Sequence, residues 1–495
     1  MTGEAKASGE LYGHVASGRS RRAIHGVLWS LISTVIPNAI SILVFLVTSR
    51  ALQPTDFGLV ALAAGIATVL GALAPTGFGS ALIQRAEINR DHLDAVFWLG
   101  ALTGFALYGV LLLASNPLSH YFNQPLLSVL VPVLGLKIIF GTLGVVPSAL
   151  LTRSMEFRQL SIRTTIAAIL GAGICLLLLY SGFGLWALVA SQIVSTFATL
   201  VGSLLSARWL PQFSFRPTAL RELFHFGGFA SLTNFVTGLS LDDVLIGALL
   251  GTHALGQFNF ARRIFTLMND AMAGPLNSVS LSLLSSLQTQ HEKRRTAFLL
   301  ATFSSALVSF PAFIGLAAVA DLVVPLLFGE QWVEAVPVLQ SFCAIGLLAC
   351  IGVLQSSLIN SHGRADLWLW YILAKQVTAA LCIVLFYRYG IALLATALAV
   401  QTYLMWLPSA FLVSRLLRLD MARYLSTFLV PIGATLMMLA AIEYMRPHVA
   451  DLAAHWRLIM CVTGGAAVYA VSAGLLAHRR LHAIRTLLAT RGDHR

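Results

Sequence analysis

Charged side chains are scarce in this 495-residue chain. Asp, Glu, Lys and Arg make up 11% of the residues, against roughly 25% in a soluble domain, while hydrophobic residues make up 58% and the mean hydropathy is +0.82. This composition excludes an ordinary soluble globular protein. Apolar segments recur along almost the whole chain, so we expect one helical membrane body instead of several soluble domains.

Cysteine is also rare, and all five cysteines lie inside apolar segments. None belongs to a CxxC pair, so the sequence predicts neither a disulfide framework nor a thiolate metal site. No lysine follows a glycine, so the phosphate-binding GxxxxGK[ST] loop is absent, as are HExxH and GxSxG. These absences argue against an ATP-driven pump and against an enzyme, and we expect no metal and no organic cofactor.

Apolar runs of about 20 residues, the length that crosses a bilayer as a helix, occur about 14 times. They lie near 24–48, 57–80, 93–114, 126–149, 160–180, 184–206, 224–250, 255–283, 297–320, 333–359, 366–387, 391–414, 421–441 and 457–477. The connecting loops are short and rich in turn-forming residues. The sequence therefore predicts an all-α polytopic membrane protein of about 14 transmembrane helices.

The basic residues segregate to one side of this arrangement. Most of the 32 lysines and arginines fall on the side that holds both termini, whereas only Arg50, Arg388, Arg446 and Arg457 fall on the other. The positive-inside rule places both termini in the cytoplasm. The net charge of +12 then reflects topology and contacts with anionic lipids, and we expect no nucleic-acid partner.

Two loops indicate an internal repeat. ALQPTDFGLVALA (51–63) and LLGTHALGQFNFA (249–261) align Gly58 with Gly256, and a second weak match occurs at a similar shift. Six helices restore the starting side of the membrane, so the two repeats are expected to be parallel. Chance similarity between hairpin turns is the alternative.

The repeat predicts a division of the chain into two lobes. Duplicated bundles of this kind place a substrate between their halves, near the middle of the membrane, and work by rocking one half against the other. The expected parts are a basic cytoplasmic N-terminus (1–22), an N-lobe of six helices (23–210), a C-lobe of six helices (211–418), an accessory helix pair (419–478) and a cytoplasmic tail (479–495).

The segment LSLDDVLIG (239–247) sets Asp242 and Asp243 inside an apolar span. Arg262 and Arg263 follow on the next span at a similar distance from the hairpin tip, so we expect both pairs at one depth near mid-membrane. A charge there costs about 2.5–3.5 kcal/mol and persists only beside a partner or a wet cavity. Two interpretations stay open: a scaffold of ion pairs, or the wall of a translocation cavity that binds a charged substrate or a coupling proton or sodium ion.

Other polar residues favour a hydrated cavity. Asn234, Asn259 and Asp270 add polarity to the same hairpin, and Lys137 and Lys375 lie near the middle of their spans without an acidic neighbour. Together with the two arginines, the lysines would bias a cavity toward an anion such as a pyrophosphate. For each lysine the alternative is a side chain that reaches the membrane surface, or a chance helix contact.

Three segments carry a family resemblance: the basic head that enters the first span (GRSRRAIHGVLW), the hairpin LDDVLIG with LLGTHALGQFNFARRI, and the loop TRSMEFRQL. They resemble the polysaccharide transporter family, whose superfamily also holds multidrug and toxic-compound extrusion (MATE) antiporters and the lipid II flippase. The resemblance covers nearly the whole chain. It implies a MATE-like fold of two six-helix lobes that open alternately, with two further C-terminal helices.

The same resemblance implies a function. Members of the family are flippases of the bacterial inner membrane that move undecaprenyl-diphosphate-linked oligosaccharide units for O-antigen, capsule or exopolysaccharide synthesis. Expected partners are this lipid-linked substrate, membrane lipids, and the glycan polymerase and glycosyltransferases of the pathway. The first span carries Pro37 and Asn38 where the lipid II flippase has charges, which weighs against lipid II as the cargo.

Three other functions fit the sequence less well. A cation-coupled multidrug antiporter would be expected to use a carboxylate in the N-lobe, where the spans show none at mid-depth. A membrane-embedded glycan polymerase or ligase would need a large outer loop with catalytic groups. A purely structural scaffold would not need paired charges at mid-membrane.

Overall fold

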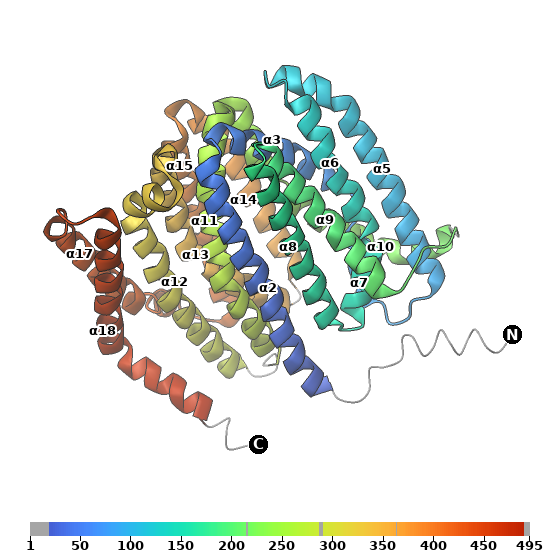
Figure 1. Ribbon diagram of the computed structural model, residues 1–495. Coiled ribbons are helices and arrows are strands. Elements are labelled where there is room, and N and C mark those ends of the chain that lie inside the picture. The colour runs from blue at the N-terminus through green and yellow to red at the C-terminus, as the bar shows by residue number, and fades with distance from the viewer. Residues whose placement is uncertain (1–18, 214–215, 287–290, 363, 490–495) are drawn as a thin grey trace. The chain divides into compact units, whose positions relative to one another are not determined.

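The structure, a computed structural model, describes residues 19–213, 216–286, 291–362 and 364–489, and all regular secondary structure in these ranges is helical. The expected all-α fold is therefore confirmed. The helices (Figure 1) are α2 (Arg19–Ala51), α3 (Pro54–Gly71), α4 (Gly77–Gln84), α5 (Arg90–Tyr121), α6 (Leu127–Leu143), α7 (Val145–Arg153), α8 (Phe157–Tyr180), α9 (Trp186–Ala207), α10 (Pro217–Gly238), α11 (Leu241–Ser286), α12 (His291–Phe328), η1 (Glu330–Ala335), α13 (Val336–Ser361), α14 (Ala365–Phe386), η2 (Tyr387–Tyr389), α15 (Ile391–Leu417), α16 (Met421–Leu425), α17 (Leu429–His448) and α18 (Ala454–Ala489).

Every apolar run that was expected to cross the membrane overlaps at least one helix. Within the described residues, 11 helices are long and apolar enough to span a bilayer, or 12 if the bent pair α6 and α7, which meet at 42°, forms one span. A shorter apolar stretch, Val35–Ala51, belongs to α2. A multi-pass helical membrane protein is thus confirmed, whereas the expected count of about 14 spans is not.

The span expected at 224–250 is interrupted in the structure. Helix α10 ends at Gly238, Leu239 adopts an extended backbone (φ −67°, ψ 106°), and α11 begins at Leu241. A second break lies inside α11 at Gly251, whose φ of 84° and ψ of 176° are open to glycine and strained for other residues. The paired aspartates therefore stand in the first turn of a helix and not in the middle of a continuous span.

The chain forms two compact units. The first contains residues 1–52 and 59–244, and the second contains residues 53–58 and 245–495. The short segment 53–58 thus packs with the second unit although both of its neighbours in sequence belong to the first. The division into an N-lobe, a C-lobe and an accessory pair stays a prediction; in the structure α10 packs against α4 and belongs to the first unit.

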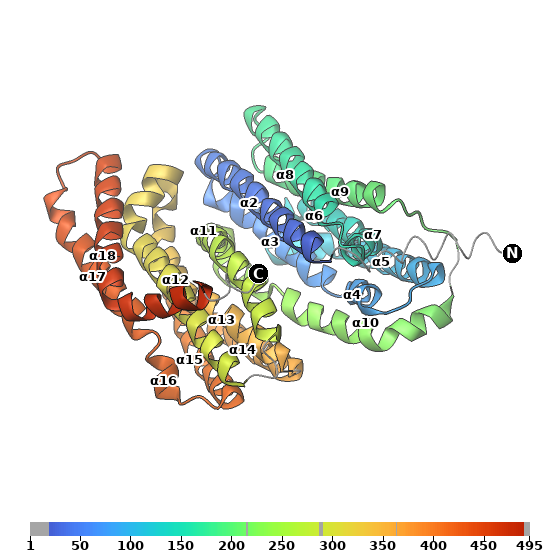
Figure 2. The same ribbon diagram turned by 90° about the horizontal axis from the view of Figure 1, so that it is seen from below.

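Within the first unit, α8 packs along α2 and α9, and α5 packs along α6, as Figures 1 and 2 show. Helix α4 lies against α10, where the backbone N–H of Gly77 donates a hydrogen bond of 3.1 Å to Ser231 Oγ. An apolar core that includes Phe78, Leu82 and Trp209 surrounds this contact. The C-terminal end of α10 reaches the turn that follows α3, where Gly238 lies beside Ala72.

Within the second unit, α12 is the central packing element. It contacts α13 on one side and α17 and α18 on another, and the last two helices lie side by side in Figure 2. Helix α13 also packs against α15, and the core between them includes Leu354, Val413 and Tyr424. The buried Gln355 amide donates to the Tyr424 hydroxyl at 3.1 Å, which satisfies a polar group inside this core.

Two glycines that the repeat aligns with one another meet in the second unit. A Cβ atom on Gly58 would lie 1.7 Å from Thr252 O, and a Cβ atom on Gly256 would lie 1.8 Å from Pro54 O. The contact is reciprocal, because the shift that aligns Gly58 with Gly256 also aligns Pro54 with Thr252. Reciprocal contacts between equivalent positions are the mark of a two-fold relation, so the geometry supports the internal repeat.

Aromatic packing holds this crossing in place. The ring of Phe57 meets Trp332 edge to face at a centroid distance of 5.1 Å, and Phe260 stacks on the same indole at 4.1 Å. Trp332 is fully buried. The two glycines let the backbones approach closely, and the bulky rings around them fill the surrounding volume.

Candidate functional site

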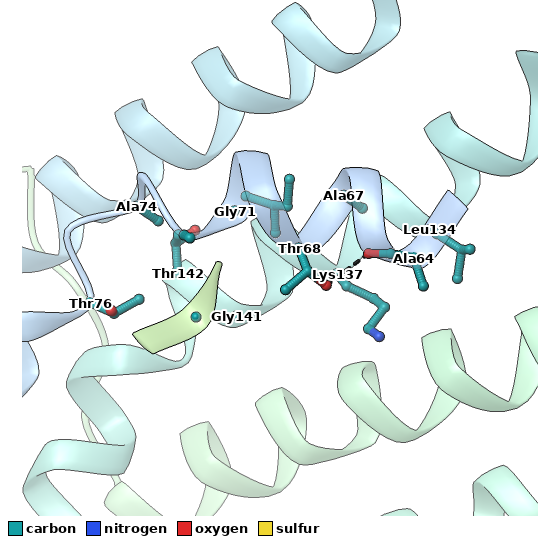
Figure 3. A pocket seen from close by; sticks show the side chains of 13 residues that line it. Ala64, Ala67, Thr68, Gly71, Ala74, Thr76, Leu134, Lys137, Gly141 and Thr142 are labelled. Atoms are coloured by element: carbon teal, nitrogen blue, oxygen red, sulfur yellow. Dashed lines mark hydrogen bonds between the residues drawn. The ribbon is translucent and has the colours of Figure 1, made fainter. Parts of the chain in front are cut away.

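A cavity of about 290 Å³ lies in the first unit between α3, α6 and the end of α10. Small side chains create the space, because Ala and Gly dominate the α3 wall. Figure 3 shows the side chains that surround it. The lining residues are Ala64, Ala67, Thr68, Gly71, Ala72, Ala74, Thr76, Leu134, Lys137, Ile138, Gly141, Thr142 and Gly238.

Lys137 is the one charged residue among these lining residues. It projects from α6, is half-buried, and its ammonium donates a hydrogen bond of 2.8 Å to Gln192 Oε1 on α9. A lysine ammonium has three donors, and within the described residues only this one bond is formed. The remaining donors are available to an anionic oxygen at the wall of the cavity.

The threonine hydroxyls in the wall are largely satisfied by their own helices. Thr68 Oγ1 donates to Ala64 O at 2.7 Å and Thr142 Oγ1 donates to Ile139 O at 3.0 Å. Their methyl groups therefore add to the apolar wall, and Lys137 stands out as the strong electrostatic feature. A cation in surroundings of this kind attracts anions more strongly than it would in water, because the low dielectric weakens screening.

Asn234 joins this region from α10. Its amide nitrogen donates a hydrogen bond of 3.1 Å to Thr76 Oγ1, a residue of the cavity wall, and its side chain is exposed. The sequence assigned Asn234 to the hairpin with the aspartates and did not connect it with Lys137. The structure instead places Lys137 in the cavity wall and Asn234 beside the wall residue Thr76.

Asp242 and Asp243 follow the cavity closely in sequence, since Gly238 lines it and α11 starts at Leu241. Both lie in the first turn of α11, where a negative charge is favoured by the positive end of the helix dipole. Asp243 is buried, with 7% of its surface exposed, and its Cβ would lie 2.8 Å from a Cβ placed on Gly65 of α3. A helix start thus accounts for two carboxylates in an otherwise apolar segment.

The predicted residues Arg262, Arg263, Asn259 and Asp270 lie in the second unit. Arg262 donates to Asn259 Oδ1 at 2.5 Å and lies over the Phe258 ring at 5.5 Å. Arg263 and Asp270 interact electrostatically along the same helix. The structure therefore brings these four residues together in two local pairs, while their pairing with the aspartates stays a prediction.

Lys375 is half-buried on α14 of the second unit. Its backbone carbonyl accepts a hydrogen bond of 3.2 Å from the Gln401 amide, which also donates to Thr378 Oγ1 at 2.7 Å. The lining of the Lys137 cavity comes wholly from the first unit. The role of Lys375 in a cavity stays a prediction.

The sequence did not predict two residues that take part in the Lys137 cavity, Gln192 and Thr76. Gln192 is a polar residue inside the apolar run WALVASQIVSTFATL (186–200), and this was the available signal for it. Thr76 lies in the turn between α3 and α4, which was expected to be the interior of a continuous span. Within the described residues, no group of three or more His, Cys, Asp and Glu side chains is arranged to hold a metal ion.

The family resemblance implies transport, and a buried carboxylate is a candidate to bind a coupling proton or sodium ion. We therefore expect Asp243→Asn, which cannot ionise, to lower the rate of cargo transport about tenfold, or roughly 1.4 kcal/mol of barrier. The comparison variant is Asp242→Asn, which changes the helix-dipole interaction in the same turn by roughly 0.3–1 kcal/mol at a more exposed position. The variant with the larger loss of transport identifies the ion-binding carboxylate. The measurement is initial transport rate in proteoliposomes. Equal transport rates for wild type and both variants would show that Asp243 has no role in transport.

Comparison with known proteins shows the family of this chain and several relatives. Residues 47–337 match the family described as "Polysaccharide biosynthesis protein". The teichuronic acid biosynthesis protein TuaB of Bacillus subtilis is 26% identical over 457 residues, which cover 91% of this chain and 95% of that protein. The succinoglycan biosynthesis transport protein ExoT of Rhizobium meliloti is 28% identical over 368 residues, covering 72% of this chain and 73% of that protein.

Among solved structures, the inward closed conformation of the lipid II flippase MurJ is similar with a TM-score of 0.76. The match covers 92% of this chain and all of that chain at 14% sequence identity. At this identity the similarity establishes the fold alone. It confirms the MurJ-like all-helical fold that the family resemblance implied, while the division into two six-helix lobes and a C-terminal pair stays a prediction.

Proposed function

Because the chain belongs to the polysaccharide biosynthesis protein family, matched over residues 47–337, we propose that it is a flippase for lipid-linked oligosaccharides. It moves undecaprenyl-diphosphate-linked repeat units across the bacterial inner membrane by alternating access, with both termini in the cytoplasm. The observation that carries the proposal is Lys137, a cation at the wall of an otherwise apolar cavity. Relatives named for teichuronic acid biosynthesis and succinoglycan transport support the substrate class.

In this proposal each part of the cargo meets a matching surface. The Lys137 ammonium binds a diphosphate oxygen with donors that Gln192 leaves available. Sugar hydroxyls exchange hydrogen bonds with Asn234 and Thr76 at the other end of the cavity. The prenyl tail stays in the bilayer. The exposed apolar side chains on the membrane helices are as apolar as the lipid, so moving the tail onto them would bring no gain in free energy.

The second unit contributes further groups in the same proposal. Arg262, Arg263 and Lys375 add positive charge for the diphosphate at another stage of the cycle, and Asp242 or Asp243 takes up a coupling proton or sodium ion. The chain itself makes no glycosidic bond. A glycosyltransferase must supply the lipid-linked unit, and a glycan polymerase must consume it on the far side.

A cation-coupled multidrug antiporter is the alternative function. The charge in the cavity argues against it, because the lysine would repel a cationic drug at the point where binding is required. Lys137 would not repel a neutral or anionic drug. Drug transport is therefore measured alongside transport of the diphosphate cargo.

The decisive experiment uses the purified full chain in proteoliposomes. The cargo is a fluorescent oligosaccharide on undecaprenyl diphosphate, and the matched control cargo carries the same sugar and prenyl chain through an uncharged linker. We expect protein-dependent movement of the diphosphate cargo at a rate at least about tenfold above that of the neutral one, which is roughly 1.4 kcal/mol of discrimination. Movement of a neutral or anionic drug, or of the cation ethidium, against a proton or sodium gradient and without movement of the diphosphate cargo would establish the antiporter instead.

A further inference from the structure

A second cavity, of about 280 Å³, lies in the second unit among the ends of α12, α17 and α18. Two arginines line it, Arg446 near the end of α17 and Arg457 in the first turn of α18. Asp321 of α12 also lines it, and Glu443 of α17 pairs with Arg446 from beside it, so both nearby carboxylates belong to Arg446. This cavity shares no residue with the one around Lys137.

The two arginines differ in what they already bind. Arg446 donates to Asp321 Oδ1 at 2.9 Å and to the Ala318 carbonyl, so it is tied to α12. Its Nε is buried without a hydrogen bond, since Glu443 Oε1 lies 3.6 Å away. Within the described part of the chain, the Arg457 guanidinium has neither a hydrogen bond nor an ion pair. The cavity thus contains the Arg457 guanidinium, with no acceptor of its own, and the Arg446 Nε–H, whose nearest carboxylate lies beyond hydrogen-bond distance.

Aromatic residues indicate the depth of this cavity in the membrane. Tyr444 and Trp456 lie close to the two arginines in sequence, and 72% and 55% of their surfaces are exposed. Exposed Tyr and Trp at helix ends are typical of the level of lipid headgroups. The apolar side chains of Leu436 and Ile459, which are also exposed, continue from this level toward the bilayer interior.

The chemistry of the lining fits a lipid phosphate. Planar guanidinium groups bind phosphate oxygens with paired hydrogen bonds, and Arg457, which has no carboxylate partner among the described residues, favours a ligand with a single negative charge. Leu322, Pro447 and Val449 complete the wall with apolar surface suited to a glycerol backbone and the start of an acyl chain. A hydrated free anion would not use this apolar surface.

We propose that Arg446 and Arg457 bind the phosphate of an anionic phospholipid, and that this lipid fastens α17 and α18 to α12. The site lies on the side where few basic residues are expected, and two of the four arginines expected there line this one cavity. Arginines are disfavoured on that side of the membrane, so a specific ligand explains their presence. The proposal is independent of the cargo that the protein transports.

The test variant is Arg457→Gln, because Arg457 holds no partner in the described structure and its replacement leaves the α12 contacts of Arg446 in place. The matched control is Arg388→Gln, an exposed arginine expected on the same membrane side but outside the cavity. Purified full-length protein in detergent is titrated with phosphatidylglycerol while its thermal unfolding midpoint is recorded. Separate arms use phosphatidylcholine and inorganic phosphate.

We expect phosphatidylglycerol to raise the midpoint of wild type and of Arg388→Gln, and to bind Arg457→Gln about tenfold or more weakly, as loss of one charge-assisted bond implies. Equal responses of all three proteins would overturn the site. An equal effect of inorganic phosphate would show a free-anion site and overturn the lipid. An equal effect of phosphatidylcholine would overturn the requirement for an anionic headgroup.

Discussion

Replacing either Gly58 or Gly256 by alanine is expected to lower the free energy of unfolding by at least about 1–3 kcal/mol, the usual range for overpacking a filled interior. The added methyl group cannot be accommodated by a rotamer change, because the atoms it meets are the carbonyl oxygens of Thr252 and Pro54 at 1.7 and 1.8 Å. The two helix ends must separate instead. Separation also breaks the edge-to-face contact between Phe57 and Trp332.

The reciprocal geometry makes this prediction sharper than an ordinary packing mutation. Gly58 meets Thr252 and Gly256 meets Pro54, and the repeat aligns these two contacted residues with one another. Gly58→Ala and Gly256→Ala should therefore be destabilising to a similar degree. The control is Gly352→Ala in α13, where a Cβ would meet no heavy atom of the described structure within 4 Å. That change should stabilise the helix by roughly 0.5–1 kcal/mol.

The measurement is the thermal unfolding midpoint of each purified variant, followed by size-exclusion chromatography of the surviving protein. Wild-type midpoints for both crossing variants would mean that the segments do not approach as closely as described. Destabilisation by only one of them would leave the close contact intact but remove the argument for a two-fold relation between the repeats.

The helical membrane architecture could be predicted from the sequence because it depends on long apolar runs and on the segregation of basic residues. The breaks could not. LSLDDVLIG reads as the continuation of an apolar span, since Leu239 and Ser240 are compatible with a helix, yet α10 ends at Gly238. The new helix packs with Asp243 against Gly65, which is distant in sequence, and the local sequence does not reveal such a contact.

The candidate site was predicted in part for a similar reason. Lys137 stood out because a lone cation in an apolar run is conspicuous, and the structure places it at a cavity. Its partner Gln192 and the wall residue Thr76 come from other helices, and no spacing rule links them to position 137. Depth along a helix could suggest which charges share a level, but not which helix faces which.

Replacing Lys137 by methionine is expected to reduce transport of the diphosphate cargo, at concentrations well below saturation, by about 10- to 100-fold. The reason is loss of one charge-assisted hydrogen bond, worth about 1.5–3 kcal/mol, to a phosphate oxygen. Methionine has a similar length and fills the same part of the cavity wall. Initial rates in proteoliposomes with the full chain measure the effect.

Stability separates this role from a structural one. If Lys137 served the scaffold, removing it would destabilise the protein; if it serves the cargo, removing a costly cation from an apolar wall should leave the unfolding midpoint unchanged or higher. Gln192→Leu is the companion variant, because it removes the partner while keeping the ammonium at the cavity. We expect Gln192→Leu to retain most of the transport that Lys137→Met loses. Two results would contradict the proposed role: normal transport by Lys137→Met, or a lower unfolding midpoint with proportionally lower transport in both variants. Either result would assign the lysine to the fold, and the diphosphate would then have no binding group in the first unit.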